Sequence, residues 1–127
     1  KKFSKMKFQL KMAQCIGIVS SINSKSSFDN LEQWINKIKE NCQIETTVVS
    51  FLFNKIDLIN ERTVSEEDII NFTDKLGIKY FEASAKTGQG VKVFFDNMVK
   101  EIYEMAYGKL NLEEIEQGSC NSECIIL

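Results

Sequence analysis

Apolar residues gather in three short continuous runs along the chain. These runs are rich in β-branched or aromatic residues and have polar neighbours, which is typical of strands buried on both faces of a sheet. They cover residues 15–22, 47–53 and 78–83. We therefore predict three buried strands.

Between and after these runs, apolar residues recur every three or four positions, which predicts helices with one buried face. The helical segments cover about residues 27–41, 65–77 and 91–106. Ser26 or Ser27 can cap the first helix. Ser65 followed by Asp68 resembles a capping box for the second helix, and Gly77 can end it in a left-handed conformation. Strand and helix alternate three times, so we predict an α/β fold in which crossover helices join three parallel strands.

Residues 1–12 fit two patterns, and we leave them unassigned. Met6, Phe8, Leu10 and Met12 alternate with polar neighbours as in a strand, whereas Phe3, Met6, Leu10 and Ala13 also fit one face of a helix. Residues 1–11 carry five lysines and no acidic residue. Such a basic segment is most often a solvated terminus, and the alternatives are a contact with a membrane surface or with nucleic acid.

Composition narrows the chemistry. The chain has 127 residues, of which 43% are apolar and 27% charged, and this length and composition are typical of one folded domain. Its net charge of −2 favours no nucleic-acid partner. It has no histidine, so mechanisms that need an imidazole base or ligand are excluded. The sequence begins with Lys1 and not with Met, from which we expect a fragment or a processed product.

Two polar groups follow the second and third predicted strands. They are Asn54, Lys55 and Asp57 after the second strand, and Ser84, Ala85 and Lys86 after the third. Ligands of open α/β sheets bind beyond the carboxyl ends of the strands, so we expect these groups to form one site. Asp57 can accept two parallel hydrogen bonds from N1–H and the 2-amino group of guanine, an edge that adenine lacks.

The other residues of the site can support that recognition. The methylene stem of Lys55 can lie over one face of the base, and Lys86 can cover the other side. Asn54 can bond the base or brace the second loop, Ser84 can brace Asp57, and the backbone N–H of Ala85 can meet guanine O6.

These two motifs, N-K-I-D at residues 54–57 and E-A-S-A-K at 82–86, resemble the guanine-specificity pair of Ras-like small GTPases. The stretch S-F-D-N-L-E-Q-W at 27–34 resembles the Rab branch most. The resemblance covers about residues 13–106 and implies that 13–107 form the carboxyl-terminal part of a P-loop-type G domain, without its amino-terminal half. It implies GTP or GDP as ligand, effector and prenylation proteins as partners, a monomeric state, and a location on the cytoplasmic face of membranes with a cytosolic pool.

The chain also departs from that family. It has no G-x-x-x-x-G-K-[ST] phosphate loop, and residues 74–77 match D-x-x-G only at the end of a helix, so we assign no catalytic or metal-binding residue. Mg²⁺ is expected only in an intact family member. Ser20 and Ser21 stand where the family has Asp, and Phe53 replaces a small residue and can crowd a phosphate loop. We expect an exposed apolar edge at 15–22, weak GTP binding and no hydrolysis by this chain.

The last segment, residues 108–127, reads as a flexible hypervariable tail. It ends in C-I-I-L at 124–127, which has the C-a-a-X form, and a terminal Leu favours geranylgeranylation of Cys124. Cys120 is a candidate for a second lipid or is a spare thiol. From residue 109 onward the tail has one lysine against four glutamates and lacks a polybasic run to assist the anchor.

The resemblance thus implies a Rab-like small GTPase that acts as a switch in membrane traffic, of which this chain holds the base-binding part. Whether this chain acts as an enzyme is left open. The alternatives are a short, non-hydrolysing binding module and a non-functional remnant of a small GTPase gene.

Overall fold

Parallel strands form the centre of the molecule. The computed structural model describes residues 2–107 and 124–126, with side chains over 5–107. β1 (Cys15–Ser21), β2 (Val48–Asn54) and β3 (Lys79–Glu82) run parallel in the order β3-β2-β1. The three predicted strands and the α/β class are confirmed.

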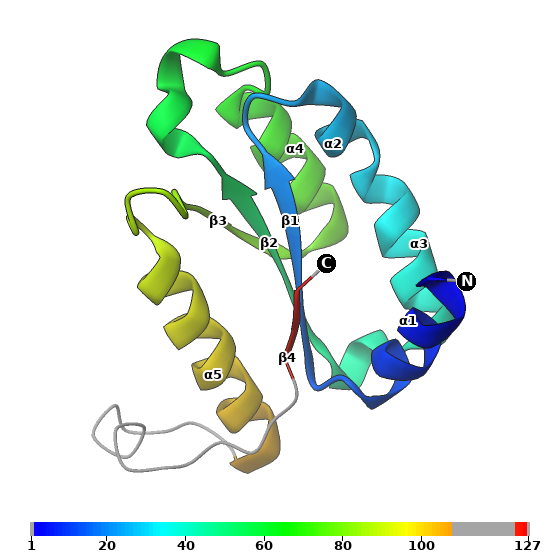
Figure 1. Ribbon diagram of the computed structural model, residues 1–127. Coiled ribbons are helices and arrows are strands. Elements are labelled where there is room, and N and C mark those ends of the chain that lie inside the picture. Colours follow the sequence, from blue (N-terminus) through cyan, green and yellow to red (C-terminus); the bar gives the residue numbers. More distant parts are fainter. Residues whose placement is uncertain (1, 108–123, 127) are drawn as a thin grey trace.

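The outer edge of β1 carries a fourth strand that sequence analysis did not predict. β4 (Cys124–Ile126) runs parallel to β1 and aligns Cys124 with Cys15, Ile125 with Ile16 and Ile126 with Gly17 (Figure 1). The expectation of an exposed edge is therefore wrong over residues 15–17, because the chain's own carboxyl-terminal segment hydrogen-bonds there. The expected flexibility of residues 108–123 lies outside the described residues.

Helices cover both faces of the sheet (Figure 1). α2 (Lys25–Asp29), α3 (Leu31–Asn41) and α4 (Glu66–Leu76) lie on one face, and α5 (Val91–Tyr107) lies on the other. Two short 3₁₀ segments, η1 (Ile44–Thr46) and η2 (Ile56–Glu61), flank β2. The core has a matching division, since Phe51 and Ile18 face α3 and α4, whereas Leu52 and Val48 face α5.

The basic amino-terminal segment is helical. α1 spans Lys2–Met12 and buries Leu10, while Met6 packs against the same core. The helical alternative for residues 1–12 is thus the correct one, because Met6, Leu10 and Ala13 meet the core from one face. The Cys42 thiol donates to the carbonyl of Leu10 at 2.9 Å, and burial raises the pKa of that thiol.

Helix ends follow local capping, with one correction. Asp68 N–H donates to Ser65 Oγ at 3.1 Å, and Gly77 ends α4 at φ 65°, as predicted. The helix expected at 27–41 begins at Lys25 instead and is divided at Asn30. Ser24, and neither Ser26 nor Ser27, is its cap, because Ser24 Oγ accepts the N–H of Ser27.

Two residues at which the chain departs from the family are explained by packing. The Phe53 ring is fully buried in the core, with its centroid 6.2 Å from that of Phe28 and 6.1 Å from that of Tyr80. The expectation that this ring can crowd a phosphate loop stays a prediction, because this chain contains no such loop. Ser20 is buried and its hydroxyl lies 2.9 Å from that of Ser27, which ties β1 to α2.

Candidate functional site

The two predicted loops meet at the carboxyl ends of β2 and β3. The backbone N–H of Ala83 donates to the carbonyl of Phe53 at 2.9 Å, which extends the pairing of the two strands into the loops. The N–H of Ile56 then donates to the carbonyl of Ala83 at 3.3 Å. All six candidate residues therefore lie at one edge of the sheet, as the parallel topology requires.

Asp57 and Ser84 are in direct contact. The hydroxyl of Ser84 donates to Asp57 Oδ1 at 2.6 Å. Ser84 is fully buried and its Oγ also accepts the N–H of Thr87 at 3.1 Å, whereas Asp57 is exposed. The carboxylate keeps lone pairs for further donors, because a carboxylate has about four acceptor positions. The pair therefore presents an oriented acceptor to solvent.

Asn54 joins the same two loops by a different bond. Its side-chain oxygen accepts the backbone N–H of Ala85 at 3.0 Å. Asn54 was expected either to bond the base or to brace the second loop, and in the structure it braces the second loop. The Ala85 N–H is thereby shared with Asn54, so a guanine O6 would have to compete for it or receive it as a second acceptor.

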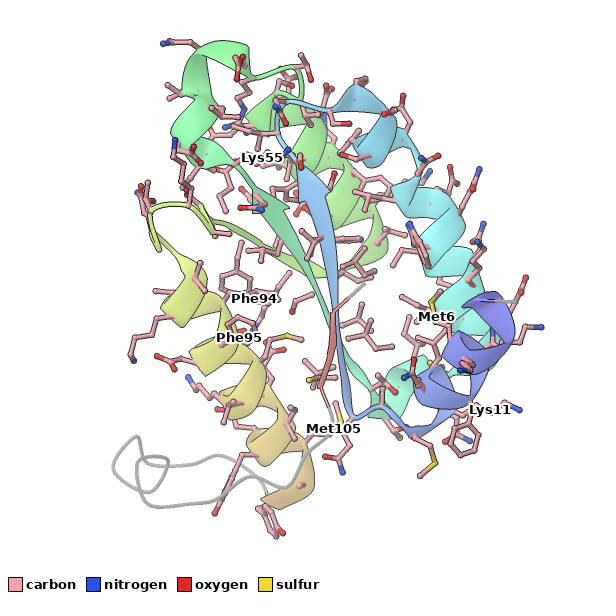
Figure 2. The ribbon with its side chains drawn as sticks, viewed as in Figure 1. Met6, Lys11, Lys55, Phe94, Phe95 and Met105 are labelled. Carbon is pink, nitrogen blue, oxygen red and sulfur yellow. The ribbon has the colours of Figure 1, made fainter. Side chains whose placement is uncertain are left out.

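Lys55 has an unusual backbone. Its φ of 69° places it in the left-handed region, and within the described residues it is the only non-glycine residue there. This conformation costs roughly 1–2 kcal/mol for an L-residue. It turns the chain between β2 and η2, and Figure 2 shows Lys55 at the end of the sheet where β2 ends. Lys55 and Asp57 are both exposed. Lys86 is exposed on the second loop.

Sequence analysis missed two supports of these loops. Arg62 Nη2 donates to Glu82 Oε1 at 2.7 Å, and its Nε donates to the carbonyl of Val64 at 2.7 Å, so it ties the end of η2 to β3. Gly90, at φ 76°, lies so close to β3 that a Cβ there would be 2.3 Å from the carbonyl oxygen of Glu82. No spacing in the sequence indicates either contact, since both depend on how the loops fold back.

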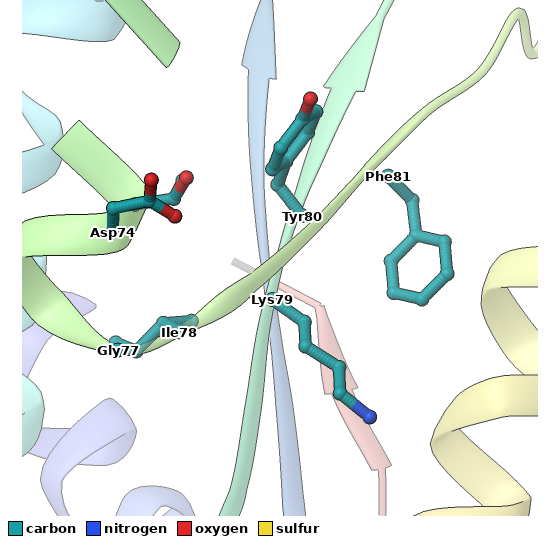
Figure 3. Close-up of a pocket in the computed structure, with 7 residues that line it drawn as sticks. Asp74, Gly77, Ile78, Lys79, Tyr80 and Phe81 are labelled. Atoms are coloured by element: carbon teal, nitrogen blue, oxygen red, sulfur yellow. The ribbon is translucent and has the colours of Figure 1, made fainter. Parts of the chain in front are cut away.

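A hollow on the surface lies away from these residues. It is formed where α4 ends and β3 begins, and Asp74, Lys79 and Tyr80 are among its lining residues (Figure 3). This is the amino end of β3, whereas the candidate residues lie at the carboxyl ends. The hollow is shallow and contains none of the six candidates, so we assign the site from its side-chain chemistry.

No helix in the described part of the chain is both long and apolar enough to cross a membrane.

Comparison with known proteins identifies the family of this chain. A model of the Ras family matches residues 1–104, which include the amino-terminal segment that sequence analysis left unassigned. Human Ras-related protein Rab-37 is 37% identical over 90 residues, which are 71% of this chain and 40% of that protein. Bovine Ras-related protein Rab-26 is 33% identical over 71% of this chain and 35% of its own length.

A plant relative gives the same result. Ras-related protein Rab11A of Lotus japonicus is 30% identical over 105 residues, 83% of this chain and 46% of that protein. The chain thus spans less than half the length of these curated relatives. Both the family match and the relatives lead to the same assignment: the chain belongs to the Ras family and, like these relatives, to its Rab branch.

Proposed function

We propose that this chain recognises the base of a guanine nucleotide, GTP or GDP. The residues are Asn54, Lys55 and Asp57 from the first loop, and Ser84, Ala85 and Lys86 from the second. The observation that carries the proposal is the 2.6 Å bond from Ser84 to Asp57, because it orients an exposed carboxylate beyond the sheet. Guanine offers two adjacent donors to such a carboxylate, and adenine offers none in those positions.

We further propose that the whole protein is a GTP-hydrolysing switch in membrane traffic, on the strength of its family. The 127-residue chain has no phosphate loop, so it lacks the charge-assisted contacts that supply most of the affinity for a nucleotide. We derive no magnesium-dependent step for this chain, because it contains no phosphate loop to hold the ion together with the phosphates. Weak GDP binding without turnover is the expected behaviour.

Calorimetric titration with GDP and ADP tests base recognition. GDP should bind weakly and ADP should not bind. Asp57→Ala should abolish GDP binding, whereas Asp74→Ala removes an exposed carboxylate at the other end of the sheet and should leave binding unchanged. Equal binding of ADP, or an effect of Asp74→Ala as large as that of Asp57→Ala, contradicts the proposal.

We also propose that Cys124 is prenylated and that Cys120 is a candidate for a second lipid, which would place the protein at the cytoplasmic face of membranes. The support is the C-a-a-X form of residues 124–127. Intact mass after incubation with a geranylgeranyl transferase should rise by one prenyl group in the wild type and in Cys120→Ser. The mass of Cys124→Ser should stay unchanged.

A second candidate is a short, non-hydrolysing module that binds the family's partners. The buried core on each face of the sheet and the pairing of β4 with β1 favour this module over a remnant without a stable fold. A single cooperative thermal transition of the purified chain would support the module. A transition without cooperativity would favour the remnant.

A further inference from the structure

α1 has two apolar stripes, and only one of them is needed for the core. Met6 and Leu10 face inward, with Leu10 1% exposed. Phe8 and Met12 lie four residues apart on another face and are 69% and 56% exposed. Positions four apart are neighbours on a helix surface, and we call Phe8 and Met12 the outward stripe of α1.

Basic residues flank the outward stripe. Lys5 and Lys11 each lie three residues from Phe8, so they border it on the helix surface, and both are exposed. α1 contains no acidic residue. Apolar side chains between lysines fit the boundary of an anionic lipid bilayer, where the rings and thioethers enter the acyl region and the ammonium groups meet the phosphates.

The fold brings this stripe to the end of the molecule where the chain's carboxyl-terminal cysteine lies. Met12 precedes β1 by three positions, and the first residue of β1, Cys15, aligns with Cys124. α5 ends at the same end with Met105 50% exposed and Tyr107 79% exposed. Figure 2 shows Lys11 and Met105 at this end and Lys55 at the opposite one.

We infer that the outward face of α1 is a membrane-docking surface for anionic lipid, which acts together with the anchor at Cys124. The inference rests in part on the proposed prenylation. One lipid chain gives only marginal binding and needs a second signal. The tail before Cys124 is acidic and cannot supply a polybasic signal, whereas α1 supplies lysines at the same end of the fold. The guanine-recognition loops then point away from the membrane.

Vesicle sedimentation of the unmodified full chain tests the surface without any lipid anchor. We expect binding to vesicles of phosphatidylcholine mixed with phosphatidylserine, and none to phosphatidylcholine alone. Lys5→Glu and Lys11→Glu should each weaken binding by at least about five-fold, since a lysine near an anionic surface contributes about 1 kcal/mol. The double change Phe8→Ser with Met12→Ser should weaken it by about ten-fold.

Matched controls lie at the other end of α5. Val93→Ser removes an apolar side chain that is 62% exposed, and Lys92→Glu reverses one exposed charge. Neither should change vesicle binding by more than about two-fold if the face of α1 is responsible. Circular dichroism melts of the variants should stay within a few degrees of wild type, because the changed side chains are exposed and the Lys92–Asp96 ion pair that Lys92→Glu removes is exposed as well.

Four outcomes overturn the inference. Equal binding to neutral vesicles, or an equal loss in the controls, would exclude a specific face. Retention of a homopolymeric RNA with the same lysine dependence, without vesicle binding, would assign the face to nucleic acid. A concentration-dependent dimer in sedimentation equilibrium that Phe8→Ser abolishes would assign it to a second copy of the chain.

The prenylated chain separates this inference from the proposed anchor. With Cys124 geranylgeranylated, wild type should stay on mixed vesicles, and the variant with Lys5→Glu, Phe8→Ser and Lys11→Glu should dissociate. If that variant binds as tightly as wild type, the role of α1 is excluded and the anchor stands. If Cys124 accepts no lipid, the anchor fails, and the unmodified-chain assay still decides the role of α1.

Discussion

Ser84 donates its hydroxyl proton to Asp57 Oδ1 at 2.6 Å, across two loops that are 27 positions apart in the sequence. The donor is buried and the acceptor is exposed, so the loop after β3 fixes a carboxylate that belongs to the loop after β2. Asn54 adds a second bond in the same direction, because its side-chain oxygen accepts the N–H of Ala85. Each loop thus holds the other in position, which is the preorganisation that base recognition requires.

Asp57→Asn should change which base is preferred. An amide presents one donor and one acceptor, which matches the N1–H and the 2-carbonyl of xanthine and mismatches the two donors of guanine. We expect GDP binding to fall by at least about a hundred-fold and xanthosine diphosphate binding to exceed it. Calorimetric titration with both nucleotides measures this. Unchanged GDP affinity would show that Asp57 does not contact the base.

Gly90→Ala should destabilise the fold more than Gly88→Ala. Both glycines have positive φ, at 76° and 84°, so each substitution carries a backbone cost of roughly 1–2 kcal/mol. Only at Gly90 would the new Cβ meet backbone, 2.3 Å from the carbonyl oxygen of Glu82, whereas Gly88 has open space. Urea unfolding should show a further loss of at least about 1 kcal/mol for Gly90→Ala. Equal losses would mean that the loop shifts freely.

Ser50→Ala and Ser20→Ala should have opposite effects on stability. Both hydroxyls are buried in the sheet, but Ser50 Oγ has no hydrogen-bond partner, while Ser20 Oγ lies 2.9 Å from Ser27 Oγ. Ser50→Ala should be neutral or raise the free energy of unfolding by up to about 1 kcal/mol, and Ser20→Ala should lower it by about 1 kcal/mol. Thermal and urea unfolding compare the two. A large loss in Ser50→Ala would reveal a partner for its hydroxyl.

Deleting residues 124–127 should make the chain aggregate, independently of any lipid. The deletion removes β4 and leaves the outer edge of β1 over Cys15–Gly17 without its strand. Cys124→Ser removes the thiol but keeps the backbone pairing, so it is the matched control. Light scattering at rising protein concentration should show aggregation of the deletion variant only. Equal behaviour of both variants would show that β4 does not protect the edge.

Sequence patterns were sufficient for most of the architecture. Continuous apolar runs predicted the strands, and Ser65 and Gly77 predicted the two ends of α4. These signals could be used because they act between residues that are close in the sequence. The helix start at 25 was missed, since Ser24, Ser26 and Ser27 are chemically equal candidates and only backbone geometry selects Ser24. The structure of residues 1–12 could not be predicted, because α1 has apolar residues on two faces and these hide the helical spacing of the buried ones.

The candidate site was likewise predicted in part. Asn54, Asp57 and Ser84 could be named because parallel strands place their carboxyl-end loops at one edge. Three contacts could not be predicted: the bond from Ala85 to Asn54, the Arg62–Glu82 pair and the close approach of Gly90 to β3. Each joins segments that are distant in the sequence, and only the folded chain sets the distance between them.

The sequence by itself determined the α/β order, the strands, the six candidate residues and the family, because periodicity and short motifs are properties of neighbouring residues. Tertiary structure alone decided that Phe53 lies in the core, that Cys124–Ile126 pair with β1, and that Lys11 of α1 lies at the end opposite Lys55. These outcomes depend on which of several segments, distant in the sequence, packs on a given edge or face of the sheet. The order of residues along the chain does not show which segment does so.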